Sequence, residues 1–258
     1  MDLGIDGLRV MITAGASGIG LAIAHAFVAE GAHVHVCDVD EDALRRLDGA
    51  NTKLTGSRCD VASRDDVTRY FDEGLAQLGG LDCLVNNAGI AGPTGHVEDI
   101  DPMEWERCLA IDLGGQFNCI RVAVPHLRKS PNPSIMNLSS LAGRLGFALR
   151  TPYAAAKWGV VGLTRSLAAE LGPDRIRVNA LLPGIVAGDR QRRVLEAKAA
   201  ARGISFAEME KLAFSYTSIK DYVTPEQLAD LVVFVSCPRG RMISGQALSV
   251  CGDSNMLA

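Results

Sequence analysis

The sequence of 258 residues has little of what would place it among nucleic-acid-binding or strongly charged proteins. Lysine and arginine together number 26, against 30 aspartate and glutamate residues, which gives a net charge of -4 at pH 7. Phosphate backbones and anionic lipids attract basic proteins. This balance therefore gives no reason to expect nucleic acid or a membrane surface as a partner.

Long apolar runs are also missing. No stretch reaches the roughly 18 consecutive apolar residues that a membrane span needs. The opening residues MDLGIDG contain neither the basic region nor the apolar region of a secretion signal. We therefore expect a cytoplasmic protein without a membrane partner.

Cysteine occurs seven times but never as C-x-x-C. Single cysteines scattered through apolar segments are typical of reduced, buried thiols in a reducing compartment. His33 and His35 alternate in AHVHVCD with no third potential ligand nearby, so we interpret them as packed or surface imidazoles and expect no metal. The cysteines are Cys37, Cys59, Cys83, Cys108, Cys119, Cys237 and Cys251.

Short apolar and β-branched runs alternate with longer segments of helical period, which predicts βαβ units and a parallel sheet covered by helices on both faces. No internal repeat or linker marks a second domain, and an α/β fold of this length is commonly one unit. Residues 187–222 have helical period without a preceding strand, so we expect a helical insertion there. The predicted strands are residues 8–13, 33–38, 53–59, 81–87, 133–140, 176–184 and 246–252, and the predicted helices are 19–31, 63–79, 101–127 and 152–172.

A glycine cluster, TAGASGIG, follows the first predicted strand. Gly15, Gly18 and Gly20 would let the backbone approach a pyrophosphate, and the N-terminus of the next helix favours its negative charge. The alternative is an ordinary tight turn. Asp38 supports the nucleotide interpretation, because it ends the next strand near the offset at which an acidic side chain binds the ribose hydroxyls.

The same carboxylate bears on the choice of cofactor. Asp38 would repel a 2'-phosphate, and neither Ser17 nor Val39 offers a positive charge to bind one, so NAD is favoured over NADP. The alternative for Asp38 is a solvated residue at a strand end.

The segment TPYAAAKWG places Tyr153 and Lys157 four residues apart on a predicted helix, so both side chains lie on one face. A packed tyrosine beside a lysine that extends to water would produce the same pattern. Spacing alone leaves both interpretations open.

Five motifs together resemble the classical short-chain dehydrogenases/reductases. They are TAGASGIG, NNAG at residues 86–89, NLSS ending at Ser140, YAAAK, and Pro183-Gly184, and their order and spacing cover nearly the whole chain. The resemblance implies one Rossmann-type domain over residues 1–258, with a doubly wound, seven-stranded parallel sheet. It also implies that Ser140, Tyr153 and Lys157 are catalytic.

This assignment is chemically reasonable. A free phenol is a poor base at neutral pH, but the Lys157 ammonium and a bound nicotinamide would favour the phenolate of Tyr153. Tyr153 would then take the proton of an alcohol as its carbon gives up hydride. Ser140 would hydrogen-bond the same oxygen, and by the resemblance Lys157 would also hold the nicotinamide ribose.

The resemblance also implies further cofactor contacts and an assembly. The long helices at 105–126 and 153–171 match those through which the family forms tetramers, so a homotetramer is expected. The implied cofactor-binding residues are Gly15, Ser17, Gly18, Ile19, Gly20, Asp38, Asp60, Val61, Asn86, Asn87, Ala88, Gly89, Tyr153, Lys157, Pro183, Gly184 and Ile185.

Three positions depart from the family pattern. Ala14 replaces a glycine, which is harmless if its φ is negative. Gly188 replaces a threonine that usually binds the carboxamide of the cofactor. Asp112 stands at the fourth catalytic position and replaces an asparagine that helps to relay protons toward the lysine.

The third departure carries a hypothesis about pH. An ionised Asp112 accepts hydrogen bonds but cannot donate them, and its charge would oppose the phenolate. We therefore expect activity to peak at alkaline pH, and Asp112→Asn to move the rise in kcat/KM to lower pH. The alternative is that Asp112 accepts from a water or a backbone N–H and does the structural work of the asparagine.

The expected substrate is a secondary alcohol or its ketone. Residues 91–96, the segment after Ser140 and the insertion are expected to line its pocket, the insertion as a lid. Arginines there would suit a carboxylate or sugar hydroxyls, although arginines on solvated helix faces are common. Sugars, sugar acids and polyols are thus candidates. The arginines are Arg144, Arg150, Arg190, Arg192 and Arg193.

Two alternatives to an NAD-dependent dehydrogenase stay open at this point. One is an NADPH-dependent ketone or acyl-carrier-protein reductase, which shares the fold and the catalytic residues. The other is a catalytically inactive nucleotide binder, because a fold does not fix a function.

Overall fold

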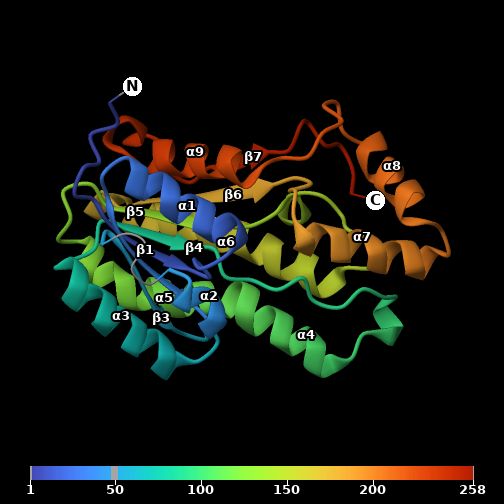
Figure 1. The fold of residues 1–258 in the computed structure, drawn as a ribbon, viewed down its shortest axis with the longest axis horizontal. Helices are drawn as coiled ribbons and strands as arrows, with labels where there is room; N and C mark the ends of the chain where they lie inside the picture. Colours follow the sequence, from blue (N-terminus) through green and yellow to red (C-terminus); the bar gives the residue numbers. More distant parts are fainter. Residues whose placement is uncertain (1, 48–51, 258) are drawn as a thin grey trace.

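The computed structural model describes residues 2–47 and 52–257, and its centre is a seven-stranded parallel sheet (Figure 1). The strands are rich in Val, Ile, Leu and Met, as expected for strands that are covered on both faces. This confirms the fold class predicted from the sequence. The strands are β1 (Arg9–Thr13), β2 (His33–Asp38), β3 (Leu54–Arg58), β4 (Cys83–Asn86), β5 (Ser134–Leu138), β6 (Arg177–Pro183) and β7 (Ala247–Val250).

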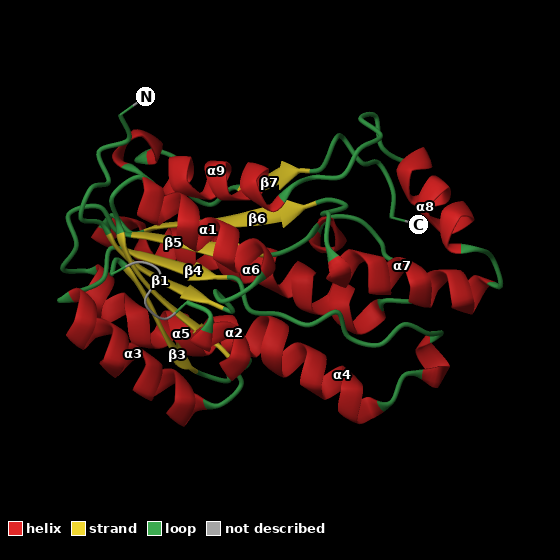
Figure 2. Cartoon of the chain, in the orientation of Figure 1, coloured by secondary structure: helices red, strands yellow, loops and turns green. Residues whose placement is uncertain are grey.

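The strand order is β3-β2-β1-β4-β5-β6-β7, so the direction of winding reverses between β1 and β4. Ligands of open α/β sheets bind in the crevice beyond the carboxyl ends of the strands at such a reversal. In Figure 2 the strand arrows of β6 and β7 point toward α7 (Asp189–Arg202), which lies at that end of the sheet.

Helices cover both faces of the sheet, as Figure 1 shows. Helices α1 and α9 pack on one face around Ile23, Phe27 and Val232. Helices α3, α5 and α6 pack on the other around Phe71 and other buried side chains. Each large apolar side chain buried in this way contributes about 1.5–3 kcal/mol. The helices flanking the sheet are α1 (Gly18–Ala29), α2 (Glu41–Arg45), α3 (Arg64–Leu78), α4 (Pro102–Leu109), α5 (Gly115–Leu127), α6 (Thr151–Leu171) and α9 (Pro225–Ser236).

Two helices differ from the sequence prediction. The segment 101–127, predicted as one helix, is α4 and α5 joined by a π-helical turn over Ala110–Gly114. Helix α9 was not predicted. Its capping box, in which the Thr224 side chain accepts from Gln227 N–H while the Gln227 side chain accepts from Thr224 N–H, is a signal that could have revealed it.

The predicted insertion consists of α7 and α8 (Phe206–Ser215). These helices pack around a small core of their own, separate from the cores on the two faces of the sheet. We call α7 and α8 the lid. The lid core contains Leu195, Ala199, Met209 and Ala213.

The remaining expectations concern single residues. Six of the seven cysteines are buried, and all seven are free thiols. His33 is exposed, whereas His35 is buried, contacts Thr55 and Ser57, and has its pKa lowered to about 4 mainly by burial. Among the described residues, no helix is long and apolar enough to cross a membrane and no cluster of three potential metal ligands occurs.

Candidate active site

A cavity of about 1050 Å³ lies where the strands end, and most of the predicted site residues line it. Gly15, Gly20, Asn86 and Asp112 are the predicted site residues outside this lining. The predicted residues that line the cavity are Ser17, Gly18, Ile19, Asp38, Asp60, Val61, Asn87, Ala88, Gly89, Ser140, Tyr153, Lys157, Pro183, Gly184 and Ile185.

The glycine loop is shaped by close backbone packing. A Cβ on Gly20 would lie 2.2 Å from the carbonyl oxygen of Ala14, and one on Gly15 would lie 2.5 Å from Cβ of Val36. Ser17 is the N-cap of α1, and its hydroxyl makes no capping hydrogen bond. The loop therefore presents unpartnered helix N–H groups and a free hydroxyl to the cavity, as a bound pyrophosphate requires.

Ala14 adopts φ +49°, in the left-handed region. Alanine would be harmless here only at a negative φ, so this expectation was wrong. The Ala14 carbonyl accepts a hydrogen bond from Asn87 Nδ2 at 2.9 Å, and this contact helps to hold the loop in its strained form.

Asp38 ends β2 and is buried against the glycine loop. Its carboxylate accepts hydrogen bonds from Ala16 N–H at 3.3 Å and Asp40 N–H at 3.2 Å. A carboxylate has about four acceptor sites, so capacity remains for ribose hydroxyls. Arg58, which was not predicted as a site residue, is the register partner of Asp38 on β3 and lines the same cavity.

Neighbouring side chains position the other cavity loops. Asn118 Nδ2 donates to the Val61 carbonyl at 3.0 Å and fixes the loop after β3. Asn87 donates to the carbonyls of the glycine loop, whereas Asn86 is buried and donates to Asn137 Oδ1 at 2.9 Å. Asn87 therefore borders the cavity and Asn86 supports the sheet.

Tyr153 and Lys157 lie on α6, with Lys157 Nζ 5.5 Å from the centre of the Tyr153 ring. Lys157 is only 3% exposed, and its Nζ donates to the Leu138 carbonyl at 3.1 Å. The lysine does not extend to water, so the packed alternative for this motif does not describe it. Ser140 Oγ accepts from Ala142 N–H at 3.1 Å, which leaves its own proton free to donate into the cavity.

Asp112 lies behind Lys157, in the π-helical turn. The carboxylate is fully buried; Oδ1 accepts from Ile90 N–H at 2.7 Å and Oδ2 lies 3.4 Å from Lys157 Nζ. Both sequence interpretations therefore hold in part: Asp112 accepts from a backbone N–H and also places a negative charge beside the lysine. Single π turns of this kind occur frequently at functional sites.

Gly188, where the family usually has threonine, has φ +136° and is the N-cap residue of α7. Residues other than glycine rarely adopt this backbone conformation, so a threonine would be strained here. The glycine is thus explained by the path of the chain into the lid.

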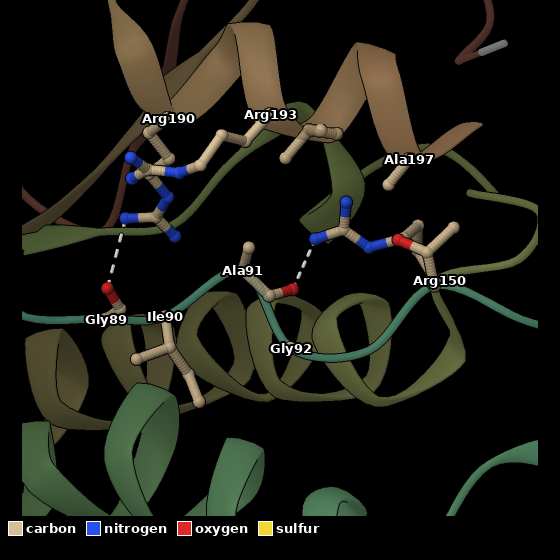
Figure 3. A pocket seen from close by; sticks show the side chains of 10 residues that line it. Gly89, Ile90, Ala91, Gly92, Arg150, Arg190, Arg193 and Ala197 are labelled. Atoms are coloured by element: carbon tan, nitrogen blue, oxygen red, sulfur yellow. Dashed lines mark hydrogen bonds between the residues drawn. The ribbon is translucent and has the colours of Figure 1, made fainter. Parts of the chain in front are cut away.

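A smaller cavity of about 390 Å³ adjoins the first, between residues 89–92 and α7 (Figure 3). Arg150, Arg190 and Arg193 line it. Arg144 is exposed outside it, and Arg192 on the outer side of α7 pairs with Glu196 at 3.0 Å. Three of the five predicted arginines are therefore in the pocket.

Comparison with known proteins identifies the family of the chain. The family model described as enoyl-(acyl carrier protein) reductase matches residues 13–252. The chain is 33% identical over 247 residues to the 2-(S)-hydroxypropyl-CoM dehydrogenase 3 of Xanthobacter autotrophicus, covering 94% of each chain. It is 36% identical over 252 residues to the trans-4-hydroxycyclohexanecarboxylate dehydrogenase of Sinomonas cyclohexanicum, covering 94% of this chain and 90% of that one.

A solved structure shows a comparable sequence identity and a similar fold. A variant of the actinorhodin polyketide ketoreductase, solved with NADPH, superposes with a TM-score of 0.89 and 31% identity, over 95% of this chain and 96% of that one. The fold, the cavity and these relatives together define an oxidoreductase that acts on alcohols or ketones with a nicotinamide cofactor. The chain belongs to the classical short-chain dehydrogenase/reductase family, as the sequence motifs predicted.

Proposed function

We propose that this protein is an NAD-dependent dehydrogenase that oxidises a secondary alcohol, reversibly, to its ketone. The observation that carries the proposal is the placement of Ser140, Tyr153 and Lys157 around one cavity whose far end holds Asp38. A bound nicotinamide would accept or return the hydride. The protein itself supplies the binding and the proton transfer.

The proton steps follow from the hydrogen bonds of the site. Ser140 has a free proton to donate to the substrate oxygen, which orients the carbinol and stabilises negative charge on that oxygen. The Lys157 ammonium, one helical turn from Tyr153, favours the phenolate that takes the hydroxyl proton. In the reverse direction Tyr153 returns the proton to the ketone oxygen.

The preference for NAD rests on Asp38. A buried carboxylate at the ribose end of the cavity would accept from two ribose hydroxyls and repel a 2'-phosphate. Arg58 supports the alternative, an NADPH-dependent ketoreductase, because it borders the same end of the cavity. Arg58 is engaged by Asp66 at 3.3 Å and Glu41 at 3.5 Å, so its charge is already neutralised.

The substrate is proposed as a polar alcohol, because cationic side chains line the smaller cavity. Relatives are named for a coenzyme M derivative and a hydroxycyclohexanecarboxylate, so they do not agree on one substrate. Sugars, sugar acids and polyols all remain candidates within this proposal.

The decisive experiment follows the absorbance of the reduced nicotinamide with sugars, sugar acids, polyols and hydrophobic secondary alcohols, each with NAD and with NADP. Turnover of one polar class with NAD is expected. Tyr153→Phe is the matched variant: it should lower kcat by at least about 100-fold while cofactor binding, measured by calorimetry, is retained. Equal activity in Tyr153→Phe would contradict the proton-transfer role of Tyr153, whereas silence across the panel with NAD bound would favour the inactive nucleotide binder.

We also propose a cytoplasmic homotetramer assembled through α4, α5 and α6. Met103, Phe117 and Trp158 on these helices are exposed in the single chain. Large apolar side chains left in water are typical of surfaces that pair with another subunit. Light scattering on the purified protein measures the subunit number directly.

A further inference from the structure

Arg150 is a buried cation without a carboxylate partner. The side chain is 2% exposed, and its guanidinium carbon lies 5.4 Å from the centre of the Phe147 ring and 5.2 Å from that of Tyr153. One terminal nitrogen donates to the Ala91 carbonyl, but Nε and the other terminal nitrogen have no partner among the described residues. Burial lowers the pKa of Arg150, which marks its charged form as poorly stabilised in this structure.

Lys198, on α7, is a second buried cation beside it. Its side chain is 1% exposed, its Nζ has no hydrogen-bond partner in the described chain, and it lies 4.0 Å from the centre of the same Phe147 ring. Phe147 therefore contacts both cations, since Arg150 packs against it as well. A lone buried charge is costly, and two neighbouring charges of the same sign cost more.

Two further arginines add to this positive charge. Arg190 and Arg193 line the smaller cavity from α7, and Arg190 donates to the Gly89 carbonyl at 3.0 Å (Figure 3). Within the described chain, no carboxylate lies within 4.0 Å of a cationic nitrogen of any of these four side chains. The nearby Asp112 is already paired with Lys157.

The position of Arg150 links this charge to the reaction. Arg150 lines both cavities, and its guanidinium packs against the tyrosine that is proposed to bind the reacting hydroxyl. Tyr153 lines the larger cavity, and Arg150 lies where that cavity adjoins the smaller one of about 390 Å³, so a molecule bound at Tyr153 is within reach of Arg150. A small anion at this place would supply the partner that the buried guanidinium lacks.

We propose that the substrate is a compact hydroxy acid, or the corresponding keto acid, whose carboxylate binds Arg150 while its carbinol is at Tyr153. Lys198, Arg190 and Arg193 strengthen the attraction without needing direct contact. The guanidinium suits this role because its planar donors match a carboxylate. The inference rests on the proposed function for the placement of the carbinol, but the anion site itself can be tested without turnover.

The first test is a binding measurement. Calorimetry on the protein saturated with NAD compares cyclohexanecarboxylate, benzoate and butyrate with their neutral amides, in the wild type, Arg150→Gln and Arg144→Gln. At least one acid should bind about ten-fold or more tighter than its amide. Arg150→Gln should abolish that preference, whereas Arg144→Gln, on the exposed part of the same segment, should retain it.

The second test is turnover of matched pairs, such as a hydroxybutyrate and its methyl ester. A preference of kcat/KM for the acid that Arg150→Gln removes supports the inference. Rapid oxidation of the neutral partners, with no preference for acids, overturns it while the proposed dehydrogenase activity stands. Acid binding that depends on Arg150, without turnover of any alcohol, supports the anion site and contradicts the proposed activity.

Two further variants keep the inference testable if Arg150→Gln fails to fold. Arg150→Lys keeps the charge and should retain part of the preference for acids. The double change Arg190→Gln with Arg193→Gln alters only exposed positions and should weaken acid binding severalfold. Failure of every acid to bind the wild type, or an undiminished preference in Arg150→Gln, overturns the inference.

Discussion

Asp112 Oδ2 lies 3.4 Å from Nζ of Lys157, and both side chains are buried. The lysine that is proposed to favour the Tyr153 phenolate thus has a negative charge on its other side. A carboxylate there offsets part of the field that the ammonium exerts on the phenol. Removing the charge of Asp112 tests how this pair affects the pH dependence of the reaction.

In Asp112→Asn, the rise of kcat/KM with pH should move to lower pH. Asparagine keeps the oxygen that accepts from Ile90 N–H but removes the negative charge, so the ammonium favours the phenolate more strongly. A pH profile of kcat/KM, taken between about pH 6 and about pH 10, measures the displacement. The control is Asp72→Asn on the exposed side of α3, and an identical profile in Asp112→Asn would contradict the electrostatic role.

Neutralising Asp38 should weaken the preference for NAD. Asp38→Asn preserves an acceptor for the backbone N–H groups but removes the charge that binds ribose hydroxyls and repels a 2'-phosphate. We expect kcat/KM with NAD to fall about ten-fold, since hydrogen bonds to a charged group contribute about 1.5–3 kcal/mol. The ratio of activity with NADP to that with NAD should rise.

The same assay tests whether Arg58 contributes to activity with NADP. Arg58→Ala should lower any residual activity with NADP and leave that with NAD unchanged. Arg69→Ala is the matched control, because Arg69 also pairs with Asp66 but does not line the cavity. Higher activity with NADP than with NAD in the wild type would contradict the proposal that NAD is the cofactor.

Ala14→Gly should not destabilise the protein. A non-glycine residue at φ +49° costs about 1–2 kcal/mol, and glycine removes that strain at an entropic cost of about 0.5–1 kcal/mol. Thermal unfolding should therefore show an unchanged or higher Tm. Ala76→Gly, at an exposed position in the last turn of α3, should lose about 0.5–1 kcal/mol; an equal loss in Ala14→Gly would argue against strain in the loop.

Lys198 should make stability depend on pH. Burial, reinforced by Arg202 and Arg150, lowers its folded pKa to about 7, from an ordinary value of 10.5. Between these values the unfolded chain binds a proton that the folded chain lacks, so stability rises with pH across this window and is lost as the pH falls toward 7. Lys198→Met should therefore raise Tm at pH about 7 more than at pH about 9.5, whereas Lys211→Met, exposed on α8, should shift both alike.

Most of the sheet and the cavity could be predicted, because period and motif spacing are local properties of the sequence. The predicted strand 33–38 matches β2 in full, and Tyr153, Lys157 and Ser140 border one cavity as expected. Roles that depend on neighbours distant in sequence were missed. Arg58 borders the ribose end only because β3 pairs with β2, and the burial of Arg150 arises from its packing against Phe147 and Ala91.

Local conformation was also difficult to predict. The φ of Ala14 accompanies a hydrogen bond from Asn87, which lies just after β4, and the loop sequence does not reveal this contact. The π turn that carries Asp112 interrupts a continuous helical period without any proline. One extra residue per turn rotates the following side chains, and pattern counting at a fixed period cannot detect it.

The separate core of the lid has a consequence for how such enzymes diversify. Because α7 and α8 pack around Leu195 and Met209 and not within the cores of the sheet, the segment is modular. Replacing residues 189–215 with those of a relative would change the wall that α7 contributes to both cavities and keep the glycine loop, Asp38 and the catalytic helix. The substrate range can thus change by exchange of α7 and α8 alone, while the rest of the fold retains the residues that carry the reaction.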